Sequence, residues 1–150
     1  MPKNKVAKRT SVYVRLDGKP VAKGRPRISG WSRGKPYVFT PETTRKYEAE
    51  LKACAKVAMG KTPPLEGPLS IDVRVVLAPA KSWSKGKAMD ALDGRIFPTK
   101  KPDLDNYVKT AMDALNGVVY LDDSQIVALS AKKVYGESPS MSMEIKPFGD

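Results

Sequence analysis

The sequence contains no histidine and a single cysteine in 150 residues. Histidine is the commonest general base and metal ligand near neutral pH, so its absence excludes Ser/His/Asp triads and zinc sites that depend on histidine. Cys54 cannot form an internal disulfide, and the helical spacing of its apolar neighbours predicts a core thiol. Any metal must therefore be bound by carboxylates, which favour hard ions such as Mg²⁺ or Mn²⁺.

Long hydrophobic runs are also missing. No apolar segment approaches the roughly 20 residues that a membrane-spanning helix needs, and the N-terminus MPKNKVAKRTS lacks the apolar segment of a signal peptide. We therefore expect a cytoplasmic protein with no membrane association. The length is that of one ordinary domain, and we expect a flexible basic arm at residues 1–10 and a single domain at residues 11–150.

Acidic residues are scarce near the N-terminus. Residues 1–39 contain eleven Lys or Arg but only one acid, Asp17, and the whole chain has a formal net charge of +11. This composition is typical of proteins that bind polyanions. Nucleic acid is the favoured polyanion, because each phosphate that Lys or Arg neutralises releases condensed counterions. A surface that is basic only for solubility is the alternative.

Hydrophobic periodicity predicts an α+β fold with a mixed, mainly antiparallel sheet and two principal helices. Alternating apolar residues predict strands at residues 11–16, 70–78, 118–121, 126–136 and 141–147, and a short one at 37–39. Helical spacing predicts a helix that starts at Thr40-Pro41 and ends near residue 59, and another over 106–116. Residues 82–95 form a weak short helix or an ordered loop. The glycine-broken stretch before residue 37 is interpreted as a basic loop.

An acidic cluster interrupts this basic chain. The stretch KPDLDNYVK contains Asp103 and Asp105, and Asp122 and Asp123 follow. On a helix Lys109 lies one turn after Asp105, and the short return after the helix could bring Asp122 and Asp123 back toward Asp103. Converging carboxylates repel one another and need a cation, for which Mg²⁺ is the natural candidate. Such a site on a phosphate-binding surface indicates phosphodiester hydrolysis, with Lys109 stabilising phosphoryl charge or orienting water.

Each acid also has a structural explanation. Asp103 can cap the helix, Asp105 can pair with Lys109, and Asp122-Asp123 can simply form a turn. Other enzymes with Asp-x-Asp, such as aspartyl-phosphate phosphatases and many glycosyltransferases, place it after an apolar strand, whereas here it follows TKKP. The sequence has no Walker-type phosphate loop.

The stretch KPDLDNYVKTAMDALNGVVYLDDSQIV resembles the signature of the RusA family of Holliday-junction resolvases. That signature consists of Asp-x-Asp-Asn, a Lys four residues after the second Asp, Asp-Ala-Leu and then Asp-Asp-x-Gln. GRPRI at 24–28 and YVFTPETTRKYE at 37–48 are similar to the N-terminal half of phage and prophage members. The resemblance implies that residues 11–150 form a single nuclease domain. It also implies that the protein is encoded by a phage or prophage and acts inside a bacterial host cell.

The resemblance also implies a mechanism and an assembly. It implies a homodimer that resolves four-way DNA junctions by paired symmetric nicks with Mg²⁺ or Mn²⁺, which suits the two-fold symmetry of the junction. Asp103, Asp105 and Asp123 would bind the metal and be catalytic together with Lys109. Asp122 would have a supporting role.

Further residues are expected to bind the DNA. Phosphate contacts are predicted for five basic residues: Lys23, Arg25, Arg27, Arg33 and Lys101. Trp31 and Phe97 could stack on bases or wedge between them, or be local packing aromatics. Asp113 is expected to support Lys109 or the basic loop. Two alternatives stay open: a non-catalytic DNA-binding or packaging-accessory protein with structural carboxylates, and a broader nuclease acting on flaps, forks or RNA.

Overall fold

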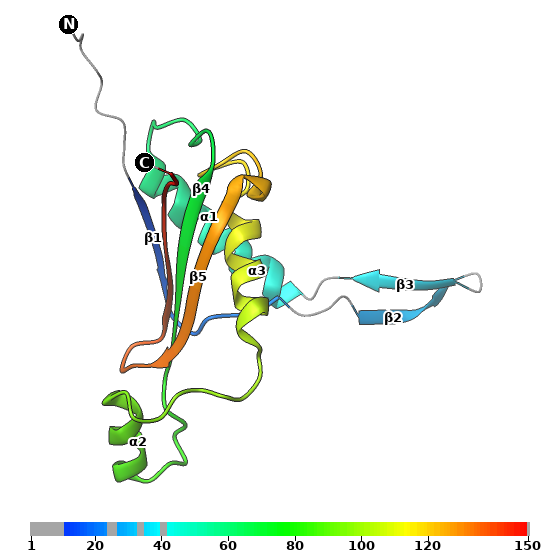
Figure 1. The fold of residues 1–150 in the computed structure, drawn as a ribbon. Coiled ribbons are helices and arrows are strands. Elements are labelled where there is room, and N and C mark those ends of the chain that lie inside the picture. The colour runs from blue at the N-terminus through cyan, green and yellow to red at the C-terminus, as the bar shows by residue number, and fades with distance from the viewer. Residues whose placement is uncertain (1–10, 24–26, 33–34, 40–41, 150) are drawn as a thin grey trace, which may run out of the picture.

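A four-stranded mixed sheet with helices on one face forms the frame of the protein (Figure 1). The computed structural model describes residues 11–23, 27–32, 35–39 and 42–149. It contains three α-helices, so the predicted α+β fold with a mixed, mainly antiparallel sheet is confirmed. The expected arm at residues 1–10 and the helix start at Thr40-Pro41 lie outside the described residues.

The order of strands in the sheet is β1-β6-β4-β5. Their bounds are Val12–Asp17 for β1, Leu69–Leu77 for β4, Ile126–Tyr135 for β5 and Ser140–Pro147 for β6. β6 pairs antiparallel with β1 and β4, whereas β4 and β5 run parallel. Parallel strands need a long crossover, and here the crossover carries two helices. In the order given above, β5 lies at one edge of the sheet and β6 is central.

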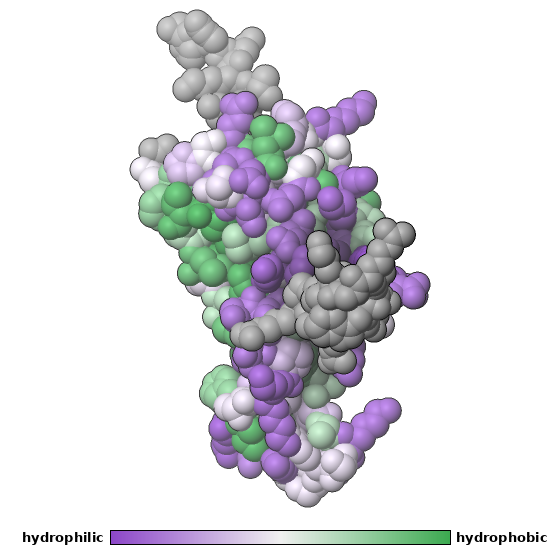
Figure 2. Space-filling model, turned by 90° about the vertical axis from the view of Figure 1, so that its right-hand side faces the viewer, coloured by the Kyte–Doolittle hydropathy of each residue, from purple (hydrophilic) through white to green (hydrophobic). Residues whose placement is uncertain are grey.

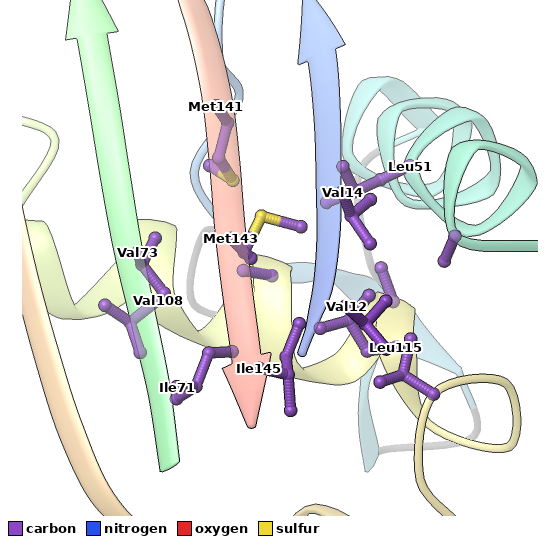
Figure 3. Close-up of a cluster of buried hydrophobic side chains, with 14 of the residues drawn as sticks. Val12, Val14, Leu51, Ile71, Val73, Val108, Leu115, Met141, Met143 and Ile145 are labelled. Atoms are coloured by element: carbon purple, nitrogen blue, oxygen red, sulfur yellow. The ribbon is translucent and has the colours of Figure 1, made fainter. Parts of the chain in front are cut away.

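The core lies between one face of the sheet and the helices. Ile71, Val73 and Val75 of β4 are buried while Asp72 and Arg74 are exposed, as expected for a half-buried strand. Figure 3 shows side chains of β1, β4 and β6 meeting those of the helices: Val12, Val14, Ile71, Val73, Met141, Met143, Ile145, Leu51, Val108 and Leu115. The opposite face carries polar residues such as Asp72 and Arg74, and none of the described helices covers it.

The helices are α1 (Glu42–Met59), α2 (Lys85–Leu92) and α3 (Leu104–Leu115). α1 and α3 are the two principal helices, and both were predicted from their apolar spacing. α2 is the weak helix expected within residues 82–95; Ser84 caps it by accepting a hydrogen bond from the backbone N–H of Lys87. No helix in the described part of the chain is long and apolar enough to cross a membrane.

A two-stranded antiparallel ribbon projects from the body of the molecule (Figure 1). It consists of β2 (Arg27–Ser32) and β3 (Lys35–Phe39). The short strand predicted at residues 37–39 is confirmed, but the stretch before it was predicted as a loop and contains β2. A register shift between Ile28 and Gly30 interrupts the alternation by which a strand is recognised in a sequence.

The prediction of a strand at residues 118–121 is wrong. This segment is a turn with isolated bridges from Tyr120 to Leu65 and to Asn116. Val119 and Tyr120 are fully buried. The segment is therefore apolar because it fills the core at the end of α3, and not because it pairs in the sheet.

Candidate active site

Two of the predicted carboxylates lie at the N-terminal end of α3. Asp103 is the N-cap residue with an extended backbone, and its side chain makes no capping hydrogen bond. Asp105 lies in the first turn, and both residues are exposed. The N-terminus of a helix favours negative charge through its dipole. Because the carboxylate of Asp103 does not cap the helix, it is free to bind another group.

Lys109 lies one helical turn beyond Asp105 and is exposed. The ion pairs among the described residues do not include one between Asp105 and Lys109. The structural explanation that these two residues merely stabilise each other on the helix is thus not supported. Both side chains are available at the surface on neighbouring turns.

The loop that precedes Asp103 is fastened to the sheet by Lys133 of β5. The Lys133 ammonium donates one hydrogen bond to the carbonyl oxygen of Lys100 at 3.0 Å and another to that of Pro102 at 2.9 Å. Lys101 lies between these two residues and is exposed. Lys101, which is predicted to bind DNA, therefore lies two residues before Asp103 in a loop that the sheet holds in place.

Asp122 lies in a network of hydrogen bonds at the other end of α3. It caps the short 3₁₀ helix η1 (Asp123–Gln125), where its Oδ2 accepts from the backbone N–H of Ser124 at 3.3 Å. The Gln125 Oε1 accepts from the backbone N–H of Asp122, and its Nε2 donates to the carbonyl oxygens of Leu65 and Gly67. Hydrogen bonds from Ser124 lower the pKa of Asp122. These contacts agree with a supporting role for Asp122.

Asp123 follows Asp122 and is half-buried. Tyr120 lies fully buried nearby, and its hydroxyl donates a 2.7 Å hydrogen bond to the carbonyl oxygen of Met112 in α3. Burial is the main cause of the raised pKa of Tyr120, and the negative charge of Asp123 adds to it. Asp123 therefore lies near the C-terminal half of α3.

The two sets of carboxylates are far apart within one chain. α3 has 12 residues and so separates its ends by about 18 Å. β5 gives a second measure: it begins at Ile126, just after η1, and Lys133, which contacts the loop before Asp103, lies about 23 Å further along the strand. Among the described residues no three acidic or cysteine side chains form a group that could hold a metal ion. The expectation that the return after α3 brings Asp122 and Asp123 to Asp103 is wrong for a single chain.

Lys23 lies where the segment leading to the ribbon meets both long helices. Its ammonium lies 2.7 Å from Asp113 Oδ2 in α3 and 3.2 Å from Glu48 Oε1 in α1. The hydrogen bond with Asp113 is the main cause of the raised pKa of Lys23, with Glu48 also contributing. Its backbone N–H donates to the carbonyl oxygen of Asn106. Asp113 thus supports the basic segment, one of the two roles expected for it.

The other predicted DNA contacts are only partly visible. Arg25 and Arg33, and the side chains of Arg27 and Trp31, lie outside the described residues. Phe97 is 56% exposed in the connection between α2 and α3. The DNA-binding role of Lys23 stays a prediction, although its ammonium is already paired with two carboxylates.

Comparison with known proteins identifies the family. Residues 17–146 match the family described as Endodeoxyribonuclease RusA. The chain is 32% identical over 117 residues to the crossover junction endodeoxyribonuclease rusA of Lactococcus phage r1t, covering 75% of this chain and 79% of that protein. It is also 40% identical over 131 residues to the uncharacterized protein YqaN of Bacillus subtilis (strain 168), covering 86% of this chain and 91% of that protein.

These matches define the class of the protein. The chain belongs to the RusA family of endodeoxyribonucleases. The resemblance drawn from the Asp-x-Asp-Asn and Asp-Asp-x-Gln motifs is therefore confirmed. The roles of the individual residues stay predictions.

Proposed function

We propose that this protein is a structure-selective, Mg²⁺-dependent endodeoxyribonuclease that resolves four-way DNA junctions by paired symmetric nicks. The proposal rests on the exposed pair Asp103 and Asp105, which follows Lys100-Lys101; the Asp103 side chain does not cap α3, and neither acid is ion-paired with another described residue. The name of the phage r1t relative refers to crossover junctions.

The available ligands fit a hard cation. The chain has no histidine, and Asp103 and Asp105 offer carboxylate oxygens that no cap occupies. A Mg²⁺ or Mn²⁺ ion held by Asp103, Asp105 and Asp123 would polarise the scissile phosphate and lower the pKa of a bound water. Lys109, one turn along the same helix, places a positive charge where it can stabilise the phosphoryl oxygens.

Because Asp123 lies at the far end of α3, we propose that a second copy of the chain supplies it. A two-fold axis perpendicular to β5 makes the strands of two copies antiparallel. The end of β5 near Asp103 then faces the partner's end near Asp123. A dimer built in this way has two complete sites, one for each of two opposing junction strands.

Exposed apolar side chains on and next to β5 favour a dimer contact at this edge of the sheet. Val127 and Leu129 of this strand are 57% and 53% exposed, and Leu121 just before it is 72% exposed. An unpaired edge strand with exposed apolar side chains favours association with another chain. Figure 2 shows hydrophobic surface collected along one side of the molecule, with hydrophilic residues over most of the remaining face. β6 cannot pair with a second copy in this way, because both of its edges are paired within the sheet.

The proposal is tested with an end-labelled synthetic four-way junction in Mg²⁺, beside linear duplex, a fork, single-stranded DNA and RNA. We expect paired nicks on opposing junction strands, and none by the Asp105→Asn protein, which should still bind the junction in a gel shift. Equal cutting of forks or RNA would favour the broader nuclease. A folded protein that binds junctions and cuts nothing in Mg²⁺ or Mn²⁺ would overturn the proposal in favour of a binding module.

A further inference from the structure

Lys133 occupies a position where the sheet pattern calls for an apolar residue. Alternate residues of β5 pair with the buried residues of β4: Leu129 with Ile71, Ala131 with Val73 and Lys133 with Val75. All three β4 partners are buried on the helix-facing side. Lys133 is thus a charged residue on the core-facing side of its strand. Departures from a local pattern of this kind concentrate at functional sites.

The Lys133 side chain makes two hydrogen bonds with a particular segment. Its ammonium donates to the carbonyl oxygens of Lys100 and Pro102, at 3.0 and 2.9 Å. Asp103 comes directly after Pro102. One side chain from the sheet therefore holds two of the last three peptide groups before the Asp103–Asp105 pair.

We propose that Lys133 is a positioning residue that holds the Asp103 and Asp105 carboxylates in the geometry needed to bind the metal; this inference rests on the proposed function. α3 fixes Asp105, but Asp103 is the N-cap residue and lacks a side-chain hydrogen bond to the helix. Its orientation consequently depends on the loop before it. Hydrogen bonds from charged donors to carbonyls are among the stronger ones, and groups that orient metal ligands affect metal affinity strongly.

A purely structural explanation also exists and makes a different prediction. Lysines on edge strands protect against unwanted strand pairing. Lys132, the neighbouring residue, is exposed and pairs with Arg74 on the opposite side of the sheet. If charge on the edge were the only requirement, removal of either lysine would change association equally, and metal binding with it.

The experiment compares Lys133→Met with Lys132→Met and Lys133→Arg. Mg²⁺ is titrated into each protein while the backbone amide NMR signals of Leu104 and Asp105 are followed, which does not require catalysis. We expect Lys133→Met to bind Mg²⁺ about tenfold more weakly or worse, with Lys132→Met unchanged and Lys133→Arg partly restored. Junction cleavage should follow the same order in kcat, with the KM for the junction unchanged.

The outcomes separate the two proposals. Cleavage by the wild type together with unchanged Mg²⁺ affinity in Lys133→Met would overturn the role of Lys133 alone. Saturable Mg²⁺ binding that depends on Lys133, in a wild type that cuts no junction, would support the role of Lys133 and overturn the proposed function. Equal weakening in Lys132→Met would overturn the positioning role, because it would show a general effect of charge. Size-exclusion chromatography and thermal unfolding show whether each variant keeps its assembly and fold.

Discussion

The two ends of α3 hold acidic residues in opposite situations. At the N-terminal end Asp103 and Asp105 are exposed, and the Asp103 side chain makes no capping bond. At the C-terminal end Asp122 is bound into a capping box with Gln125, which in turn holds the loop at Leu65. The two ends therefore differ: hydrogen bonds hold the Asp122 carboxylate in the fold, whereas the Asp103 carboxylate makes no such capping bond.

The largest effect is expected when one acid at each end of α3 is substituted. Asp103→Asn should reduce junction cleavage by about 10³-fold or more, because a bound metal contributes several kcal/mol to the transition state. Asp122→Asn keeps an oxygen that accepts from the Ser124 N–H, so its cleavage rate should stay within about threefold of wild type. Rates are measured at saturating Mg²⁺ on the labelled junction.

Circular dichroism and gel-shift binding serve as controls for both proteins. Similar losses in the two variants would contradict the distinction between a structural and a catalytic acid. We expect Asp123→Asn to lose junction cleavage as Asp103→Asn does. Loss of cleavage in Asp123→Asn but not in Asp122→Asn would support different roles for these two neighbouring acids.

The second prediction is that the acids at the N-terminal end of α3 in one chain form a site with Asp123 of the other chain of a dimer. Asp105→Asn and Asp123→Asn chains, each inactive alone, are co-expressed with different tags and the mixed dimer is purified through both. If each site combines the N-terminal acids of one chain with Asp123 of the other, one of the two sites is intact. The mixed dimer should then nick at about half the wild-type rate, on one strand at a time.

Sites contained within single chains give the opposite result. Each chain of the mixed dimer would lack one ligand, and neither site would be complete. Absence of nicking in a mixed dimer that still binds the junction would therefore contradict the shared site. The wild-type protein carrying the same two tags is the matched control.

The third prediction concerns the edge that would join the two ends. Leu129 is about half exposed in the single chain, so Leu129→Asp should fold but place a charge in the proposed interface. We expect the dimer dissociation constant to rise by about tenfold or more, measured by sedimentation equilibrium. Val57→Asp, at an 83% exposed position of α1, is the control. An unchanged assembly in Leu129→Asp would exclude this edge as the interface.

Most of the fold could be predicted from the sequence because its signals are local. The alternation in β4 and the helical spacing in α1 and α3 reflect which side chains face the core, and those elements were found where expected. β2 was missed because its pairing with β3 contains a register shift, and glycine and proline interrupt the pattern. Residues 118–121 were misassigned because burial in the core makes a turn as apolar as a strand.

The arrangement of the acids could not be obtained in the same way. The segment from Asn116 to Asp123 has seven residue-to-residue steps and can reach about 24 Å when extended. The sequence therefore permits a return toward Asp103 as well as a turn that stays at the end of α3. Non-local contacts decide between them: the Tyr120 hydroxyl bonds to Met112, and the Leu65 N–H bonds to the Val119 carbonyl. The position of Lys133 beside the loop before Asp103 likewise depends on the parallel pairing of β5 with β4. A lysine at a core-facing position of a strand was the one feature of the sequence that could have indicated a special role for it.

The smallest predicted effect concerns Lys23, whose ammonium contacts Glu48 of α1 and Asp113 of α3. Its pKa is raised above the ordinary value of 10.5, mainly by Asp113, so the folded state binds the proton more tightly than the unfolded state. Lys23→Met should lower the free energy of unfolding by about 1 kcal/mol after allowance for solvent screening. The loss should be constant from neutral pH to about 10.5 and shrink as pH rises through the raised pKa, because deprotonation then removes the same interaction from the wild type. Urea unfolding at several pH values measures this, with exposed Lys46→Met as control; a difference that does not shrink at high pH would mean that packing, and not the ion pair, is what Lys23 contributes.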